Sequence, residues 1–198
     1  METISSNRPK IVVIGSCNTD MVVKANRLPV PGETILGGTF YMNPGGKGAN
    51  QAIAAARLGA EVTFISKIGY DLFGLQALEI YRSEKINTEF IFTDQKSPSG
   101  VALISVDSFG ENSIIVAPGA SRSLSTEDIN KAEEKIKEAD IILMQLEVPI
   151  DTVEYAATIA NRYGKKVILN PAPASTLSNS FLNNVHTICL LYTSDAAD

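Results

Sequence analysis

The sequence contains only two cysteines and one histidine in 198 residues. Two cysteines, Cys17 and Cys189, are too few for a disulfide scaffold. Because both lie in apolar runs, we expect buried free thiols and a reducing, cytoplasmic location. The single histidine, His186, has no spacing partners for a catalytic triad or a zinc site, so we expect a structural or surface role and no metal site.

The sequence also lacks a long apolar run and an excess of positive charge. No stretch reaches the roughly 18 consecutive apolar residues of a membrane-spanning helix, and the polar N-terminal tail (1–10) has no apolar centre of a signal peptide. The 17 Lys and Arg stand against 22 Asp and Glu, a net charge of −5. This balance excludes broad binding to nucleic acids or anionic membranes, because no basic excess is available to neutralise phosphates.

Apolar strands alternate with helices through most of the chain, which is typical of one large globular domain. The expected strands are 11–16, 61–68, 140–146, 166–169 and 186–190. The expected helices are 49–58, 71–85, 125–138, 150–163 and 178–183. Asp71 is in position to cap the second helix, and Ser125 and Asp128 resemble a capping box. The pattern predicts an α/β fold, a doubly wound and mostly parallel sheet with helices on both faces.

The middle of the chain departs from this alternation. Three short strands, 89–92, 100–106 and 114–116, follow one another without helices between them. Residues 34–41 indicate an irregular or edge strand, because Gly37 and Gly38 interrupt it. We therefore expect a small antiparallel β-sheet inserted into the α/β core or laid over it.

Polar residues follow the carboxyl ends of several predicted strands and begin one predicted helix. In open α/β sheets, ligands bind beyond the carboxyl ends of the strands. The residues at these positions are Asn18, Asp20, Gly45–Gly48, Asn50, Glu147 and Asn170. Carboxylates and amides supply the donors and acceptors that sugar hydroxyls need, and glycines allow close backbone approach. The set predicts a site for a polyhydroxyl ligand.

Two common nucleotide-binding motifs are absent. A Walker A loop would need glycine where Tyr41 stands and a hydroxyl side chain where Gly48 stands. A dinucleotide fingerprint would need three glycines, and only Gly15 is present after the first strand.

The segments around these residues resemble the ribokinase-like, or PfkB, carbohydrate kinase family from about Ile11 to Cys189. The Gly-Gly-Lys-Gly-Ala-Asn run ending at Asn50 is a signature of that family. The matching segments are Asn18–Asp20, Pro31–Thr34, Asn43–Ala52, Gly69–Gly74, Val101–Ile104, Gly110–Asn112, Gln145–Pro149 and Asn170–Pro173.

The resemblance implies a ribokinase-like fold and ATP-dependent phosphorylation of D-ribose at its 5-hydroxyl, in D-ribose catabolism. It implies a β lid, formed from about 21–41 and 100–116, that closes over the sugar and pairs with a second subunit in a homodimer. It also implies that the substrate contacts come from Asn18, Asp20, Gly45, Gly46, Lys47, Asn50, Ala102 and Glu147. In the family, Mg²⁺ and a monovalent cation (K⁺) accompany ATP.

The family pattern ends at Cys189. The family continues with Pro-Asn-Glu and, later, with an anion hole that carries the catalytic aspartate, whereas this sequence reads Leu190–Asp198. The resemblance therefore describes an incomplete domain (11–189), with the nucleotide site and catalytic residue expected beyond it. We interpret 190–198 as adapter read-through and expect this chain to lack kinase activity. Ser121, where the family usually has asparagine, is a small departure.

Other interpretations remain open. The chain can belong to a kinase for another sugar or for a nucleoside on the same fold. It can also be a non-catalytic sugar-binding or dimerisation module. A generic α/β domain with unrelated polar loop ends is the simplest alternative.

Overall fold

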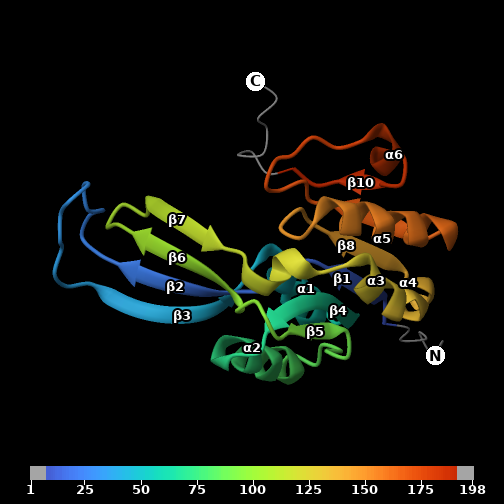
Figure 1. Ribbon diagram of the computed structural model, residues 1–198, viewed down its shortest axis with the longest axis horizontal. Coiled ribbons are helices and arrows are strands. Elements are labelled where there is room, and N and C mark those ends of the chain that lie inside the picture. Colours follow the sequence, from blue (N-terminus) through green and yellow to red (C-terminus); the bar gives the residue numbers. More distant parts are fainter. Residues whose placement is uncertain (1–7, 191–198) are drawn as a thin grey trace, which may run out of the picture.

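A six-stranded parallel sheet forms the centre of the computed structural model, which describes residues 8–190 (Figure 1). The interpreted read-through tail lies outside the described residues except for Leu190, and so do residues 1–7. The strand order is β10 (Thr187–Ile188), β9 (Lys166–Leu169), β8 (Ile141–Met144), β1 (Lys10–Ile14), β4 (Glu61–Gly69) and β5 (Ile91–Asp94). Every neighbouring pair in this sheet is parallel.

Helices cover both faces of this sheet and form a core on each face. Successive residues of β1 point to opposite faces, so β1 contributes to both cores. Val13 packs in a core with α1 (Lys47–Arg57) and α2 (Leu72–Ser83). Val12 and Ile14 pack in a second core on the other face. The helices of that second face are α3 (Thr126–Lys131), α4 (Glu133–Glu138), α5 (Ile150–Arg162) and α6 (Asn179–Leu182). The predicted doubly wound α/β class is confirmed.

The helix-start signals act as the sequence predicts. Asp71 caps α2 by accepting a hydrogen bond from Gly74 N at 2.8 Å. Ser125 and Asp128 form a reciprocal capping box at the start of α3. The single helix predicted over 125–138 is wrong, because the chain breaks between α3 and α4 at Ala132, whose N–H bonds Ile129 O in a tighter turn.

A second, four-stranded sheet projects from the α/β body and is called the lid here (Figure 1). Its order is β3 (Thr39–Gly45), β2 (Asn18–Lys24), β6 (Gly100–Val106) and β7 (Asn112–Ala117). β2 runs antiparallel to β3 but parallel to β6, and β6 and β7 form an antiparallel pair. The expectation of an antiparallel sheet is therefore wrong, because the central pair of this sheet is parallel. These strands extend beyond the expected lid bounds of 21–41 and 100–116.

The predicted composition of the inserted sheet needs three corrections. The strand expected at 89–92 is β5, and it pairs in parallel with β4 in the main sheet, where Ile91 is buried. The strand expected from 34 begins only at Thr39, because Gly37 and Gly38 adopt positive φ angles of 104° and 101°. The sequence does not predict β2 as a strand, since its polar start does not show the apolar alternation of one.

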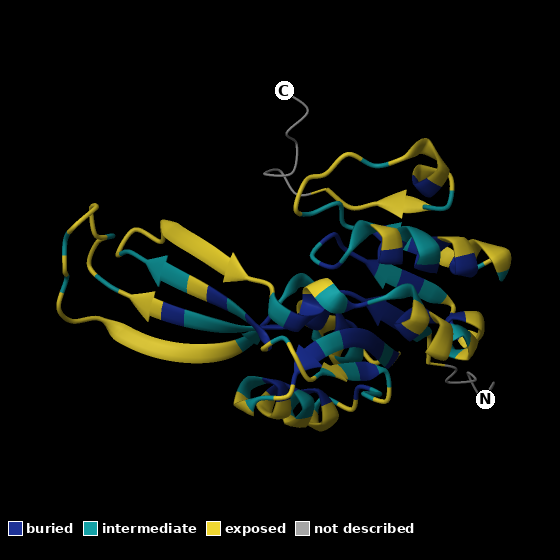
Figure 2. Ribbon diagram, in the orientation of Figure 1, coloured by how far each residue is buried: buried dark blue, intermediate teal, exposed yellow. Residues whose placement is uncertain are grey.

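The lid is mostly exposed, whereas the main sheet is mostly buried (Figure 2). Within residues 8–190, no helix has both the length and the apolar character needed to cross a membrane. Cys17 is buried as expected, but Cys189 is exposed just after β10, the edge strand of the sheet within residues 8–190. His186 is exposed, and its Nδ1 accepts a hydrogen bond from Val167 N.

Candidate functional site

The strand order reverses between β1 and β8. From β1 the chain proceeds to β4 and β5 on one side and later adds β8, β9 and β10 on the other. Ligands of open α/β sheets bind beyond the carboxyl ends of the strands at such a reversal. Ser16 follows β1 and Glu147 follows β8, and Ser16 Oγ donates to Glu147 Oε2 at 2.5 Å. The topology thus places a candidate carboxylate at the position where a ligand is expected.

Glu147 is also held by the first residue of α1. Lys47 N donates to Glu147 Oε2 at 3.0 Å, and Lys47 Nζ lies 3.2 Å from Glu147 Oε1. The side chains are 40% and 19% exposed, so this ion pair remains open to a ligand. Two elements far apart in sequence therefore fix the orientation of one carboxylate.

The glycines before α1 permit this close approach. Gly46 has a φ of 91°, and a Cβ there would lie 2.9 Å from both Cys17 Cα and Ser16 O. A Cβ on Gly45 would lie 2.0 Å from Asp20 Oδ1. The loop therefore packs against the β1–β2 connection and the Asp20 carboxylate in a way that side chains at these two positions would prevent.

Asp20 lies on β2 at the root of the lid, between Asn43 of β3 and the buried Ala102 of β6. Burial raises the pKa of its carboxyl, the charge of Glu147 raises it further, and Lys47 opposes both effects. The Asp20 carboxyl is thus partly dehydrated and lies in the field of a second carboxylate and an ammonium group. Hydroxyl donors from a sugar would relieve the desolvation and the repulsion.

Asn18 and Asn50 are the two amides among the predicted substrate contacts. Asn18 is only 6% exposed, and its Oδ1, packed against Gly100, has no hydrogen-bond partner among residues 8–190. Asn50 is exposed in the first turn of α1. Asn170 does not join them, since its Nδ2 donates to Cys189 O at the end of β10.

A cavity of about 310 Å³ opens beside Glu147. Its walls come from the ends of β1 and β8, the lid root, the short helix η1 (Gly119–Ser123) and the loop after β9. It is lined by Ser16, Asn18, Val116, Pro118, Arg122, Leu146, Glu147 and Pro173. Of the predicted substrate contacts, Asn18 and Glu147 line the cavity. The other six, Asp20, Gly45, Gly46, Lys47, Asn50 and Ala102, lie at the adjoining lid root and α1 N-terminus.

Sequence reasoning missed Ser16, Gln145 and Arg122. Ser16 ends the predicted first strand, so its position was a usable signal. Gln145 is fully buried below Glu147 and donates from Nε2 to Gln51 Oε1 at 2.5 Å, which ties the end of β8 to α1. Arg122 carried no motif, and only the tertiary structure brings it to the cavity.

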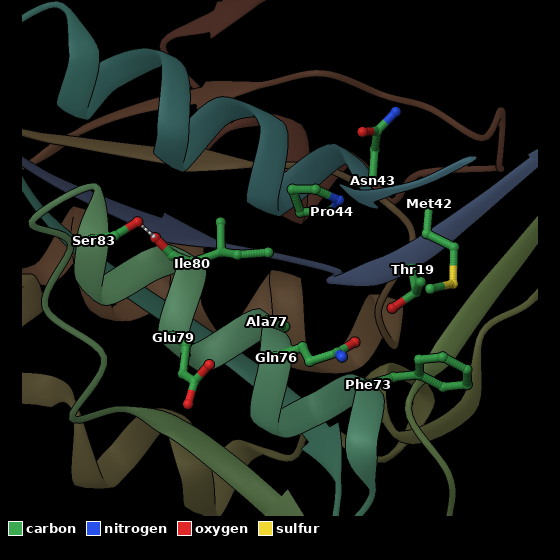
Figure 3. Close-up of a pocket in the computed structure, with 10 residues that line it drawn as sticks. All are labelled: Thr19, Met42, Asn43, Pro44, Phe73, Gln76, Ala77, Glu79, Ile80 and Ser83. Carbon is green, nitrogen blue, oxygen red and sulfur yellow. Dashed lines mark hydrogen bonds between the residues drawn. The ribbon is translucent and has the colours of Figure 1, made fainter.

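A larger cavity, of about 430 Å³, lies on the other side of the lid root against α2 (Figure 3). It is lined by Thr19, Met42, Pro44, Phe73 and Ile80 among others. Side chains alternate along β2, so Thr19 points away from the face that carries Asn18 and Asp20. None of the predicted substrate contacts lines this cavity, and its single charged lining residue, Glu79, is exposed.

The chemistry of the site is therefore that of polar recognition. The Glu147 carboxylate and the Asn18 amide line the cavity, and Asp20 and Lys47 lie beside it, which suits a ligand with several hydroxyls. In the part of the chain that the structure describes, no group of three or more His, Cys, Asp or Glu side chains is arranged to hold a metal ion.

Residues 8–190 match the family model described as pfkB family carbohydrate kinase. The ribokinase of Haemophilus influenzae is 45% identical over 181 residues, which cover 91% of this chain and 59% of that protein. The deoxyribokinase of Salmonella typhi is 42% identical over 164 residues, covering 83% of this chain and 54% of that protein.

Solved structures agree with these sequence relatives. The structure of Arabidopsis thaliana ribokinase complexed with ribose and ATP superposes with a TM-score of 0.82 at 31% identity, covering 94% of this chain and 61% of that one. The chain thus spans little more than half the length of the relatives it matches.

Proposed function

Because this chain belongs to the PfkB family of carbohydrate kinases, we propose that it forms the sugar-binding part of an enzyme that phosphorylates D-ribose at the 5-hydroxyl with ATP. The observation that carries this proposal is the pair of partly buried carboxylates, Asp20 and Glu147, at the reversal of strand order. The product is ribose 5-phosphate.

Recognition of ribose rests on carboxylates oriented before the sugar arrives. Glu147 already accepts hydrogen bonds from Ser16 and Lys47, and its remaining lone pairs accept from sugar hydroxyls. Burial separates the Asp20 carboxylate from water, and sugar hydroxyls replace the lost water as hydrogen-bond donors. The Asn18 amide and the Asn50 side chain add further contacts. Gly45, Gly46 and Ala102 supply close backbone approach and shape, and Lys47 donates to a sugar oxygen.

The lid provides closure over the bound sugar. β2 carries Asp20 at its root and continues to Lys24 near the lid tip. A contact between Asp20 and the sugar therefore connects the sugar directly to a strand of the lid. Closure of such a lid excludes water, which competes with the sugar hydroxyl as the phosphoryl acceptor.

Phosphoryl transfer depends on positioning and on stabilising charge at the transferred group, which Mg²⁺ supplies when bound. The described residues offer no cluster of metal ligands, so we assign none of them to Mg²⁺ or K⁺. ATP is proposed as co-substrate, in keeping with the Arabidopsis relative solved with ribose and ATP. We place the enzyme in the cytoplasm, where its free thiols stay reduced.

The lid also supports a homodimer. Five exposed apolar side chains share one face of the lid sheet, since their strand partners place them in register. They are Val23, Phe40, Met42, Leu103 and Ile115, each at least 40% exposed. A contiguous apolar surface of this kind favours burial against another protein surface, and we propose the lid of a second copy.

A second candidate is phosphorylation of 2-deoxyribose, which the deoxyribokinase relative at 42% identity favours. The two sugars differ by one hydroxyl. A site that hydrogen-bonds this hydroxyl discriminates strongly against the sugar that lacks it, because buried partners are then left unpaired.

Calorimetric titration of the 198-residue chain with both sugars tests the proposal. We expect saturable binding of ribose and binding of 2-deoxyribose that is weaker by about tenfold or more. Tighter binding of 2-deoxyribose would favour the second candidate. No binding of either sugar at concentrations up to about 10 mM, a range that covers even weak complexes, would contradict both.

A further inference from the structure

One wall of the cavity beside Glu147 has no role in the sugar recognition described above. This wall is η1, which connects the last lid strand, β7, to α3. Arg122 of η1 lines the cavity and is the only lysine or arginine that does so. Arg122 is exposed and forms no hydrogen bond or ion pair with residues 8–190, although carboxylates neutralise several other cations of the chain.

The neighbours of Arg122 hold η1 in place. Ser121 Oγ bonds both N and O of Cys17, at 3.3 and 3.4 Å. Ser123 Oγ donates to Asp94 Oδ2 at 2.5 Å and to Ala120 O at 2.9 Å. These contacts anchor the backbone of η1 on both sides of Arg122, while its guanidinium has no such anchor.

Asn18, already assigned to the sugar, lines the same cavity. Asn18 is 94% buried, and its Oδ1 lacks a hydrogen bond among the described residues. This oxygen is a hydrogen-bond acceptor, so it suits a hydroxyl donor of the sugar and not a phosphoryl oxygen. Ser16 and Glu147 already bind each other, and Lys47 balances the charge of Glu147. Among the residues that line the cavity, the guanidinium of Arg122 is therefore the one cation, and it has no acidic partner among residues 8–190.

We propose that Arg122 binds a phosphoryl group that lies in this cavity, next to the sugar site. A guanidinium presents paired N–H donors that match two phosphoryl oxygens. The inference deepens the proposed function. The phosphoryl group belongs either to the phosphorylated sugar or to the nucleotide, and both have the same recognition chemistry.

Titrations of the wild-type chain and three variants test this assignment. The variants are Arg122→Gln, Arg122→Lys and Arg82→Gln, the last being an exposed arginine of α2 that lines no described cavity. The probes are ribose, ribose 5-phosphate, ADP and inorganic phosphate. Circular dichroism and urea unfolding of each variant establish that it is folded.

We expect Arg122→Gln to weaken binding of ribose 5-phosphate by about tenfold or more and that of ribose by less than about twofold. Arg122→Lys keeps the charge but loses the paired donors, so it should fall between wild type and Arg122→Gln. Arg82→Gln should change neither affinity. Loss of ADP binding alone would assign the phosphoryl group to the nucleotide.

Three results would overturn the inference. Equal weakening of ribose and ribose 5-phosphate would show that Arg122 contacts the sugar. Unchanged affinity for every phosphorylated probe would show that it contacts none. Unfolding of both Arg122 variants would show a structural role. If wild type fails to bind ribose but binds inorganic phosphate through Arg122, the proposed function fails while this inference stands.

Discussion

Asp20 should weaken the folded chain while it strengthens the binding of sugar, and Asp20→Asn separates these two effects. Burial of the carboxylate is the largest cause of its raised pKa, and the nearby charge of Glu147 adds to it. Asparagine has the same shape and carries no charge. The substitution should therefore raise the free energy of unfolding at neutral pH.

The effect of Asp20→Asn on ribose binding should have the opposite sign. A hydrogen bond to a charged group contributes about 1.5–3 kcal/mol. Losing one such bond weakens ribose binding by about 10- to 100-fold. The assay pairs urea unfolding with calorimetric titration of ribose. The matched control is Glu79→Gln, which removes a negative charge from the cavity against α2 and should leave ribose affinity unchanged.

The pH dependence follows from the same shift. The folded pKa of Asp20 lies above its usual value of 3.8, so the ionised form destabilises the fold. This penalty is fully present above the folded pKa and is absent below the unfolded one. Ribose affinity should therefore fall on acidification at a higher pH than an ordinary aspartate would give. A parallel loss of stability and affinity in Asp20→Asn would refute this reasoning.

Three further predictions concern the scaffold and the lid. Gly46→Ala should destabilise the chain by about 3 kcal/mol or more in urea unfolding, because it adds backbone collisions to a positive φ. Gly59→Ala has a similar φ in open space and should lose only about 1 kcal/mol; equal losses would contradict the steric argument. Lys67→Met leaves the buried Asp128 carboxylate without its 2.7 Å partner and should lower the free energy of unfolding at pH 7 by about 3 kcal/mol. Urea unfolding measures this loss, and a loss below about 0.5 kcal/mol would contradict the prediction. Leu103→Asp should shift the proposed homodimer to monomer in analytical ultracentrifugation; an unchanged sedimentation coefficient would contradict a role of this lid face in the interface.

Local sequence signals predicted much of the fold and the residue types of the site. The apolar run that forms β1, the cap at Asp71 and the capping box at Ser125 act between neighbouring residues, so short-range chemistry determines them. Asp20 and Glu147 could be identified as candidates because both follow predicted strands, and ligands of open α/β sheets lie beyond strand ends.

Contacts between segments distant in sequence determined the remaining features of the fold and the site. β5 belongs to the main sheet because Ile91 finds a buried position beside β4, and no local pattern specifies which strand a short apolar segment joins. Cys189 is exposed because β10 lies at a sheet edge. Arg122 reaches the cavity only because η1 folds back against the β1–β2 connection, over a sequence separation of about 100 residues. The local sequence therefore determines the residue types of the site and the helix starts. The neighbours of each strand and the charge of the cavity depend on contacts that only the folded chain makes.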